Sequence, residues 1–371
     1  MQHPGRTLGF LDRNSCRFRP YYPDVLRSTI FLLPILCVSC FTVLPACAQS
    51  DVSQVRALVR EGQAALDKDD FARAVQDFEQ ARQLAADSLD VAHGLLLSYL
   101  QAGRLSSAIT TGTQEVQQWP QDAELHHYLG LAYFKAGQKA QAANELQRAK
   151  SLDARNADIH FDLALVFLSQ NQYSPAADEL EKALQSKGSN PLVYLLLGRA
   201  YQNSNRSLQA IDQFRTALRL DPNTPLAHYH LGFAYSSVGR TKDAIAEYEK
   251  EMARSPQNPD VQYQLGHSLL ESGDWKNAVV HLQRASELDP QNGDAFYELG
   301  KALLLQGEAQ RGISALQKAT KLNPMDPSPH YQLARALEKN GSSDAKQEWQ
   351  RFAELKKVQQ QTGGMATGRI H

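Results

Sequence analysis

The sequence contains almost no cysteine. Its four cysteines, Cys16, Cys37, Cys40 and Cys47, all lie within the first 47 of 371 residues. The rest of the chain can therefore form no disulfide, no cysteine-ligated zinc site and no cysteine nucleophile. The fold of that part is independent of the redox state of its compartment.

An excess of charge of one sign is missing as well. Lys and Arg number 39 and Asp and Glu number 40, which gives a formal net charge of -1. A protein that binds phosphate backbones carries a strongly basic surface, because its cations neutralise the phosphates. The balance argues against nucleic acid as a partner.

Motifs of catalytic sites are also absent from the sequence. The chain has no G-x-S-x-G nucleophile elbow, no G-x-x-x-x-G-K phosphate loop and no H-E-x-x-H metal motif. His228 and His230 stand two residues apart on a predicted helix, so they point to different faces and cannot share a metal ion. We therefore expect no enzymatic activity, no cofactor and no metal site.

One uncharged apolar run lies near the N-terminus. It extends from Thr29 to Ala48, and five arginines between Arg6 and Arg27 precede it. A basic segment followed by an apolar one is typical of an export signal. Since the positive flank stays in the cytoplasm, we expect the remaining chain to lie outside it.

The end of this run leaves three fates open for residues 1–48. Ala46-Cys47-Ala48 is an A-x-A site, so cleavage after Ala48 would release a signal peptide. Residues 44–47, Leu-Pro-Ala-Cys, also resemble a bacterial lipobox, in which Cys47 would be acylated and become the new N-terminus. An uncleaved membrane anchor is the third alternative. All three indicate an exported protein of the periplasm or outer membrane of a bacterium, which contacts the membrane only through its N-terminal segment.

A pattern of 34 residues fills most of the chain. From residue 55 onward it returns without an insertion or deletion, and its clearest mark is leucine followed by a small residue. The pairs are Leu129-Gly130, Leu163-Ala164, Leu197-Gly198, Leu231-Gly232, Leu265-Gly266, Leu299-Gly300 and Leu333-Ala334. Seven successive matches at one period indicate tandem structural repeats.

The frame holds nine units of equal length. Their expected bounds are 55–88, 89–122, 123–156, 157–190, 191–224, 225–258, 259–292, 293–326 and 327–360. Residues 49–54 are expected to form a short lead-in, and residues 361–371 a disordered tail.

Each unit is predicted to form two amphipathic helices. In the unit that begins at residue 191, one helical face recurs at i, i+3, i+4 and i+7, as Tyr194, Leu197, Gly198 and Tyr201. Small residues stand where two helices cross closely, since a larger side chain would hold the axes apart. Glycine between the helices supplies the positive φ that ends a helix, at Gly137, Gly239, Gly273, Gly307 and Gly341. A two-helix hairpin buries too little surface alone, so the units must stack.

Two units depart from the pattern. Gly112 and its neighbouring threonines predict a weak second helix in the second unit, which we expect to fray first. In the last unit, Lys346 and Gln350 place polar groups where side chains would pack, as a water-exposed end cap would.

The pattern resembles the tetratricopeptide repeat family over residues 55–360. The third unit carries the landmarks nearly throughout, as Leu129-Gly130, Tyr133, Gly137, Ala142, Leu146 and Ala149. At the family's first aromatic position this chain often has histidine, namely His126, His160, His228 and His330. The resemblance implies an all-α fold, a right-handed superhelical solenoid of helix-turn-helix units. It also implies that the first helix of each unit lines a concave groove, where family members bind extended peptides or partner helices.

The groove positions of the first helices give the candidate binding residues. The fifth positions include His127, Phe161, Tyr229, Tyr263, Tyr297 and Tyr331, and the ninth and twelfth positions add Phe134, Arg199, Phe233, Lys301 and Arg335. Tyrosine suits recognition, because it offers a flat apolar face and a hydroxyl group at low entropic cost. The alternative is that the tyrosines only pack between neighbouring helices and that the cations are solvated surface charges.

These observations predict an exported, non-enzymatic scaffold that holds a protein or peptide segment in its groove. The alternative is an outer-membrane lipoprotein that acts as an assembly factor for an envelope machine, such as a pilus, the outer membrane or polysaccharide export. Acylation of Cys47 would discriminate the two. The carboxylate clamp of chaperone-binding relatives is absent, because the sixth positions read Gly94, Tyr128, Asp162, Leu196, His230, Gln264 and Glu298.

Overall fold

The computed structural model describes residues 46–187 and 190–367. The chain divides into two compact units, residues 1–50 and 51–371. Most of the expected signal segment, up to residue 45, lies outside the described residues. Within the described ranges, no helix is both long and apolar enough to span a membrane.

The described residues form eighteen helices and no strand. They are α1 (Ala46–Asp67), α2 (Phe71–Leu84), α3 (Leu89–Gln101), α4 (Leu105–Gln118), α5 (Ala123–Lys135), α6 (Lys139–Leu152), α7 (Ala157–Ser169), α8 (Tyr173–Lys187), α9 (Pro191–Asn203), α10 (Ser207–Leu220), α11 (Ala227–Ser237), α12 (Thr241–Arg254), α13 (Pro259–Ser272), α14 (Trp275–Leu288), α15 (Gly293–Leu305), α16 (Ala309–Leu322), α17 (Pro327–Lys339) and α18 (Ala345–Thr367). Odd-numbered helices are the first of each unit, which we call helix A, and even-numbered helices are the second, helix B.

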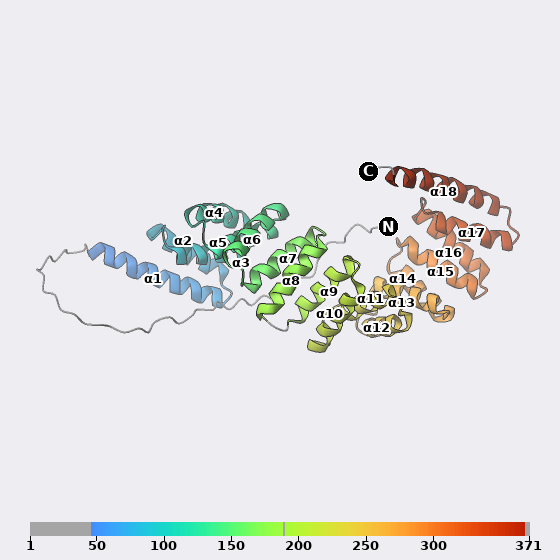
Figure 1. Ribbon diagram of the computed structural model, residues 1–371, viewed down its shortest axis with the longest axis horizontal. Coiled ribbons are helices and arrows are strands. Elements are labelled where there is room, and N and C mark those ends of the chain that lie inside the picture. The colour runs from blue at the N-terminus through green and yellow to red at the C-terminus, as the bar shows by residue number, and fades with distance from the viewer. Residues whose placement is uncertain (1–45, 188–189, 368–371) are drawn as a thin grey trace, which may run out of the picture. The chain divides into compact units, whose positions relative to one another are not determined.

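The helices stack in chain order within residues 51–371 (Figure 1). From α2 to α18 each helix packs against the next, and helices A of neighbouring units also touch, as α11 touches α9 and α13. Each unit thereby covers the apolar face that the unit before it leaves open. The predicted all-α solenoid of helix-turn-helix units is confirmed.

The turn between helix A and helix B has one residue with positive φ in every unit. Six of these are glycines with φ between 70° and 86°, namely Gly103, Gly137, Gly239, Gly273, Gly307 and Gly341. In the other units Asp69, Asn171 and Asn205 take φ of 59° or 60°. Short polar side chains tolerate this region better than other non-glycine residues do. The prediction made for five glycines is confirmed, and the same turn recurs through the array.

Helix A crosses helix B at the small residue of the repeat. A Cβ atom added to Gly198 would lie 2.5 Å from Cε1 of Phe214, and one added to Gly266 would lie 2.7 Å from Cγ of Leu282. Side chains in a close-packed interior have no room for such contacts. The expectation that small residues let the two axes approach is confirmed.

The second unit forms a complete helix B. α4 spans 14 residues, as α6 and α10 do. Its glycine has a packing role, because a Cβ atom on Gly112 would lie 3.3 Å from Cδ1 of Leu96 and 3.0 Å from Cδ1 of Leu129. The weakness expected of this helix is not visible in its length.

Histidines at the first aromatic position bind helix B of their own unit. Their Nδ1 atoms lie 2.5–2.7 Å from a glutamate oxygen, in the pairs His126–Glu145, His160–Glu179, His228–Glu247 and His330–Glu348. Charge-assisted hydrogen bonds of this kind hold the two helices in a fixed relation. The departure from the aromatic residue of the family is therefore compensated by a glutamate on the facing helix.

The sixth unit begins with a strained residue. In the third, fourth, fifth, seventh, eighth and ninth units an Asn or Asp side chain caps helix A, but here the place is taken by Thr224, whose Oγ1 donates to the carbonyl of Asp221 at 2.7 Å. Leu226 then adopts φ 59°, and α11 starts only at Ala227. A left-handed leucine is uncommon, because its Cβ approaches the following carbonyl oxygen.

Both ends of the array differ from the sequence expectation. α1 begins at Ala46, so residues 49–54 are helical and form no separate lead-in. α18 continues to Thr367, so residues 361–367 are helical where we expected a disordered tail. No proline stands in either segment to end the helix. The remaining tail residues, 368–371, lie outside the described part of the chain.

In the last unit the register between helix A and helix B is shifted by one residue. His330 binds Glu348, 18 residues later, whereas His126 binds a glutamate 19 residues later. Ala345, 7% exposed, takes the packing place expected for residue 346, and Lys346 is exposed. The expectation of an unbroken register is therefore wrong at α18, and a one-residue shift explains the apparent polar substitutions.

Candidate functional site

Four tyrosines stand at the same place on helices A of four successive units. We call Tyr229, Tyr263, Tyr297 and Tyr331, on α11, α13, α15 and α17, the tyrosine ladder; all four are partly exposed. Helix α13, which carries Tyr263, touches both α11, which carries Tyr229, and α15, which carries Tyr297. Burial raises the pKa of Tyr229 to about 12 and also raises the pKa of Tyr263, so both are neutral at pH 7.

Basic side chains accompany three of the ladder tyrosines. Nζ of Lys301 and Cζ of Arg335 lie 5.1 Å and 5.6 Å from the ring centroid of the tyrosine four residues earlier. The ring of His267 stacks on Tyr263, with centroids 6.1 Å apart and planes 18° apart. Residues four apart share one face of a helix, so Lys301 and Arg335 lie as cations over aromatic rings, and the imidazole of His267 stacks on the third ring.

Glu298 joins two of these basic groups, and the sequence analysis did not identify it. Its Oε2 accepts a hydrogen bond from Nζ of Lys301 at 2.8 Å, and its Oε1 lies 3.7 Å from Nδ1 of His267 on the preceding helix A. His267 stands at the ninth position of its unit and Glu298 at the sixth position of the next unit, 31 residues later. This spacing is the sequence feature that indicates the contact.

The ring of Tyr331 packs against two aromatic rings of helix B in its own unit. Its ring lies 5.5 Å from that of Trp349 at 79° and 5.3 Å from that of Phe352, both on α18. Edge-to-face aromatic pairs of this kind stabilise a core. The other three ladder tyrosines are also partly buried against the hydrophobic core, so the packing alternative applies in part to all four.

The candidates in the first half of the array are used mostly within the fold. His127 is 6% exposed, and its Nε2 lies 2.7 Å from Oδ2 of Asp162 on α7. This pair joins two neighbouring helices A and leaves little of the imidazole for a partner. Phe134 and Phe161 are partly buried against the main hydrophobic core. Phe233, on α11 beside the ladder, is 36% exposed and offers more apolar surface.

Arg199 on α9 stands apart from the other candidate cations. No carboxylate or other acceptor within the described ranges binds its guanidinium group, and burial lowers the pKa of Arg199. Lys301, by contrast, is paired with Glu298. Arg199 is thus partly buried on α9, and the hydroxyl of Tyr173 on α8 acts on its charge.

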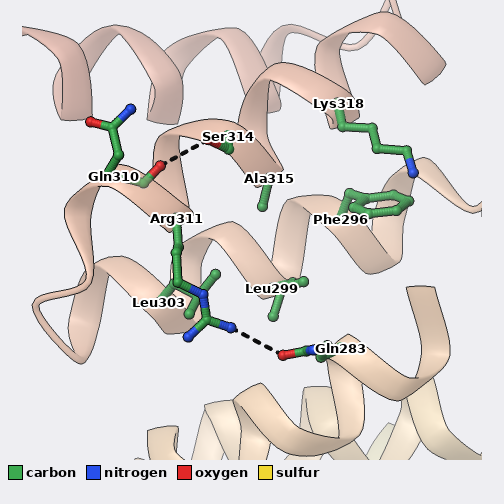
Figure 2. Close-up of a pocket in the computed structure, with 9 residues that line it drawn as sticks. All are labelled: Gln283, Phe296, Leu299, Leu303, Gln310, Arg311, Ser314, Ala315 and Lys318. Carbon is green, nitrogen blue, oxygen red and sulfur yellow. Dashed lines mark hydrogen bonds between the residues drawn. The ribbon is translucent and has the colours of Figure 1, made fainter. Parts of the chain in front are cut away.

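A separate hollow of about 340 Å³ lies between α14, α15 and α16 (Figure 2). Ala315 opens it, because this alanine stands where other units carry the glutamate that binds histidine. Nζ of Lys318 lies 4.0 Å from the ring centroid of Phe296, and Arg311 donates to Oε1 of Gln283 at 3.1 Å. Both cations are thus engaged within the hollow, which contains none of the residues that the sequence analysis selected.

The side chains of the ladder are of the kinds that bind polypeptide. Tyrosine and arginine are enriched in protein interfaces, where flat rings supply contact area and guanidinium groups supply directed hydrogen bonds. In the part of the chain that the structure describes, no group of His, Cys, Asp or Glu side chains could hold a metal ion.

Sequence comparisons identify repeats along most of the array. A family model described as "TPR repeat" matches residues 130–171, 208–239 and 266–307. Models described as "Tetratricopeptide repeat" match residues 59–123 and 294–324. Together the matches take in more than half of the chain. No curated protein sequence matches it.

Several solved structures resemble the chain in fold. The APC/C hetero-tetramer Cut9–Hcn1 contains a chain with 17% identity and a TM-score of 0.49 over 72% of this chain, which spans 52% of that one. YrrB, described as a TPR protein with an unusual peptide-binding site, is 22% identical, with a TM-score of 0.45 over 51% of this chain and 97% of its own. MamA from Desulfovibrio magneticus RS-1 is 20% identical, with a TM-score of 0.43 over 45% and 95% of the two chains.

Proposed function

Because the chain belongs to the tetratricopeptide repeat family, a family of protein-interaction scaffolds, we propose that it holds an extended segment of a partner protein in the concave groove along its helices A. The observation that carries the proposal is the tyrosine ladder. Its four tyrosines stand on successive helices A, and all four side chains are partly exposed. A row of such side chains gives contact area at low entropic cost.

The ladder also has a direction that suits a polypeptide chain. Its tyrosines repeat on α11, α13, α15 and α17, so a partner that crosses the helices A meets a similar ring at each step. The cations at Lys301 and Arg335 lie over these rings and can bind carbonyl oxygens or acidic side chains of the partner. We propose that the chain has no catalytic activity of its own, and turnover of a substrate by the purified protein would contradict this.

Capture of partners from a native envelope extract tests the proposal with paired variants. Tyr263→Ala/Tyr297→Ala removes two ladder rings, and Leu208→Ala/Val280→Ala removes two exposed apolar side chains of helices B, which are 69% and 60% exposed. The wild type and the helix B variant should retain the same partner, and the ladder variant should lose it. Equal capture by all three proteins would place the binding surface elsewhere. Circular dichroism and thermal melting establish that each variant is folded.

Export is part of the same proposal. The basic and apolar N-terminal segments support it, and the outer-membrane lipoprotein with a role in envelope assembly is the alternative. Mass spectrometry of the protein purified from its native host discriminates them. An N-terminus at Gln49 supports a cleaved, soluble scaffold, and an acylated Cys47 supports the lipoprotein. An intact N-terminus on protein recovered from the cytoplasm would contradict export.

A further inference from the structure

The hollow between α14, α15 and α16 lies where other units hold their own two helices together by a polar contact. In the third unit Nδ1 of His126 meets Glu145 at 2.7 Å, and four further units keep a His–Glu or Gln–His contact at this place. Phe296 and Ala315 stand at the same two positions five repeats later. Their side chains carry no polar atom, and the short side chain of Ala315 leaves a hollow of about 340 Å³ open (Figure 2).

The floor of this hollow is apolar. Phe296, Leu299 and Leu303 of α15 line it together with Ala315 of α16, and each of the four is between 2% and 8% exposed. A partner side chain that enters the hollow covers the apolar atoms that these residues still expose, and the removal of apolar surface from water is favourable. The hollow therefore suits a large apolar side chain.

Two cations stand at the ends of the hollow and differ in their partners. Arg311 and Lys318 are seven residues apart on α16, with Ala315 between them, so about two helical turns separate them (Figure 2). Arg311 is paired with Glu308 at 2.5 Å. Nζ of Lys318 lies 4.0 Å from the ring centroid of Phe296, and no carboxylate among the residues that the structure describes pairs with it. One positive charge beside the apolar floor is therefore open to a carboxylate.

The position of Lys318 has a different contact in two other units. Arg148 and Arg284 stand five repeats and one repeat before it, and each donates to the closing turn of the preceding unit, to Gln121 at 3.3 Å and to Gln257 at 2.6 Å. Lys318 extends over the floor of the hollow instead (Figure 2). In the described part of the chain no acceptor binds the three N–H donors of its ammonium group.

We propose that this hollow is a second docking site, separate from the groove, and that it receives a large apolar side chain of a second partner polypeptide with Asp or Glu one or two positions away. The apolar side chain covers the floor, and the carboxylate pairs with the ammonium group of Lys318. Ala315 and Lys318 are three residues apart on α16 and hence about 5–6 Å apart. Because an extended chain advances about 3.3 Å per residue, the acidic residue stands one or two positions from the apolar one.

The rim of the hollow suits a peptide backbone. Gln310 is exposed there, and its side-chain amide both donates and accepts hydrogen bonds, as a peptide group does. A chain that crosses the hollow can therefore place one side chain inside it and keep its backbone at the rim. The hollow contains no residue of the tyrosine ladder, so binding there is independent of binding in the groove.

A random 12-residue peptide library displayed on phage tests this site on the full-length protein. The library is first depleted on Phe296→His/Ala315→Glu, which restores the pair of the third unit, fills the hollow and leaves the groove unchanged. Phages that the wild type then retains should share a large apolar residue with Asp or Glu one or two positions away. No retained phage, or retained peptides without an acidic residue, would overturn the proposal. Ala315→Gln, which introduces the residue of the fifth unit at this place, is used for the depletion if the double variant unfolds.

The affinity of one retained peptide, synthesised with Glu or with Gln at the acidic position, tests the role of Lys318. The Gln peptide should bind the wild type about three- to tenfold more weakly, and this difference should disappear in Lys318→Gln. Lys321→Gln is the matched control, because Lys321 is exposed one turn later on α16 and does not line the hollow. It should preserve the difference between the two peptides.

The ladder variant Tyr263→Ala/Tyr297→Ala separates the two sites. It should bind the retained peptide with the affinity of the wild type, since neither tyrosine lines the hollow. A loss of binding in this variant would place the peptide in the groove and overturn the second site. Equal affinity of the Glu and Gln peptides for the wild type would overturn it as well, and neither result contradicts the proposed function.

Discussion

Leu96 on α3 and Gly112 on α4 face each other as a large and a small residue, in the reverse order to their counterparts in other units. Elsewhere the small residue lies on helix A and the large one on helix B, as in Gly198 against Phe214. In the second unit Leu96 is fully buried, and a Cβ atom on Gly112 would lie 3.3 Å from its Cδ1. The glycine that appears to weaken α4 is the complement of the leucine that faces it.

This exchange predicts strong coupling between the two positions. Gly112→Leu alone should destabilise the second unit by about 1–3 kcal/mol, because it overpacks the crossing. Leu96→Gly alone should cost about 2–5 kcal/mol, because it opens a cavity. The double variant restores the arrangement of the other units, so its loss should be at least about 1 kcal/mol smaller than the sum of the single losses. Urea unfolding with hydrogen exchange of the α3 and α4 amides measures this, and additive losses would contradict the packing account.

The fold follows from the sequence because one signal repeats in register. A small residue, a turn glycine and an alanine return at a period of 34 residues in most units, so the units support one another as evidence for the fold. What the period could not show are local exceptions to it. The packing role of Gly112 is evident only from its contact with Leu96. The register shift at α18 is evident only because Ala345, and not Lys346, is buried at the packing position.

The left-handed Leu226 predicts a stabilising substitution. Leu226→Gly should raise the free energy of unfolding by about 0.5–1 kcal/mol, because glycine adopts φ 59° without the Cβ strain of leucine. The side chain is 40% exposed, so little packing is lost. Val280→Gly is the control, since this exposed residue lies within α14 and glycine should cost about 1 kcal/mol there. Thermal melting that shows a loss for both variants would contradict the strain.

The pair of His160 and Glu179 predicts that the free energy of unfolding depends on pH in the acidic range. Burial tends to raise the pKa of Glu179, but hydrogen bonds from His160, Lys150 and Lys182 outweigh it and lower the pKa in the folded state. Ionised Glu179 therefore stabilises the folded state at pH values above the pKa of the unfolded state, about 4.5. This stabilisation is lost as the pH falls through the lower pKa of Glu179 in the folded state. Glu179→Gln should therefore cost about 1–3 kcal/mol at pH 7 and progressively less below pH 4.5.

Melting curves of the wild type and Glu179→Gln between pH 7 and pH 3 measure this dependence. Glu354→Gln removes an exposed partner of Arg351 and should change stability little at any pH. A difference between wild type and Glu179→Gln that is the same at pH 7 and at pH 3 would show that ionisation of Glu179 contributes nothing.

The candidate site was predicted in part. The tyrosine ladder follows directly from the fifth position of each unit, since that position faces the neighbouring helices A. The role of Glu298 could not be derived in the same way, because it depends on which side chain of the preceding unit comes near. A contact between the ninth position of one unit and the sixth position of the next becomes evident only from the stacking, as the distance between His267 and Glu298 shows.

Site-specific photo-crosslinking in the native host tests the central claim most directly. A benzoyl-phenylalanine is placed at Tyr263 in the ladder or at Val280, which is 60% exposed on a helix B. The account predicts that the probe at position 263 crosslinks one defined partner protein, identified by mass spectrometry, and that the probe at position 280 does not. The same partner crosslinked from both positions, or from position 280 alone, would contradict binding along the helices A.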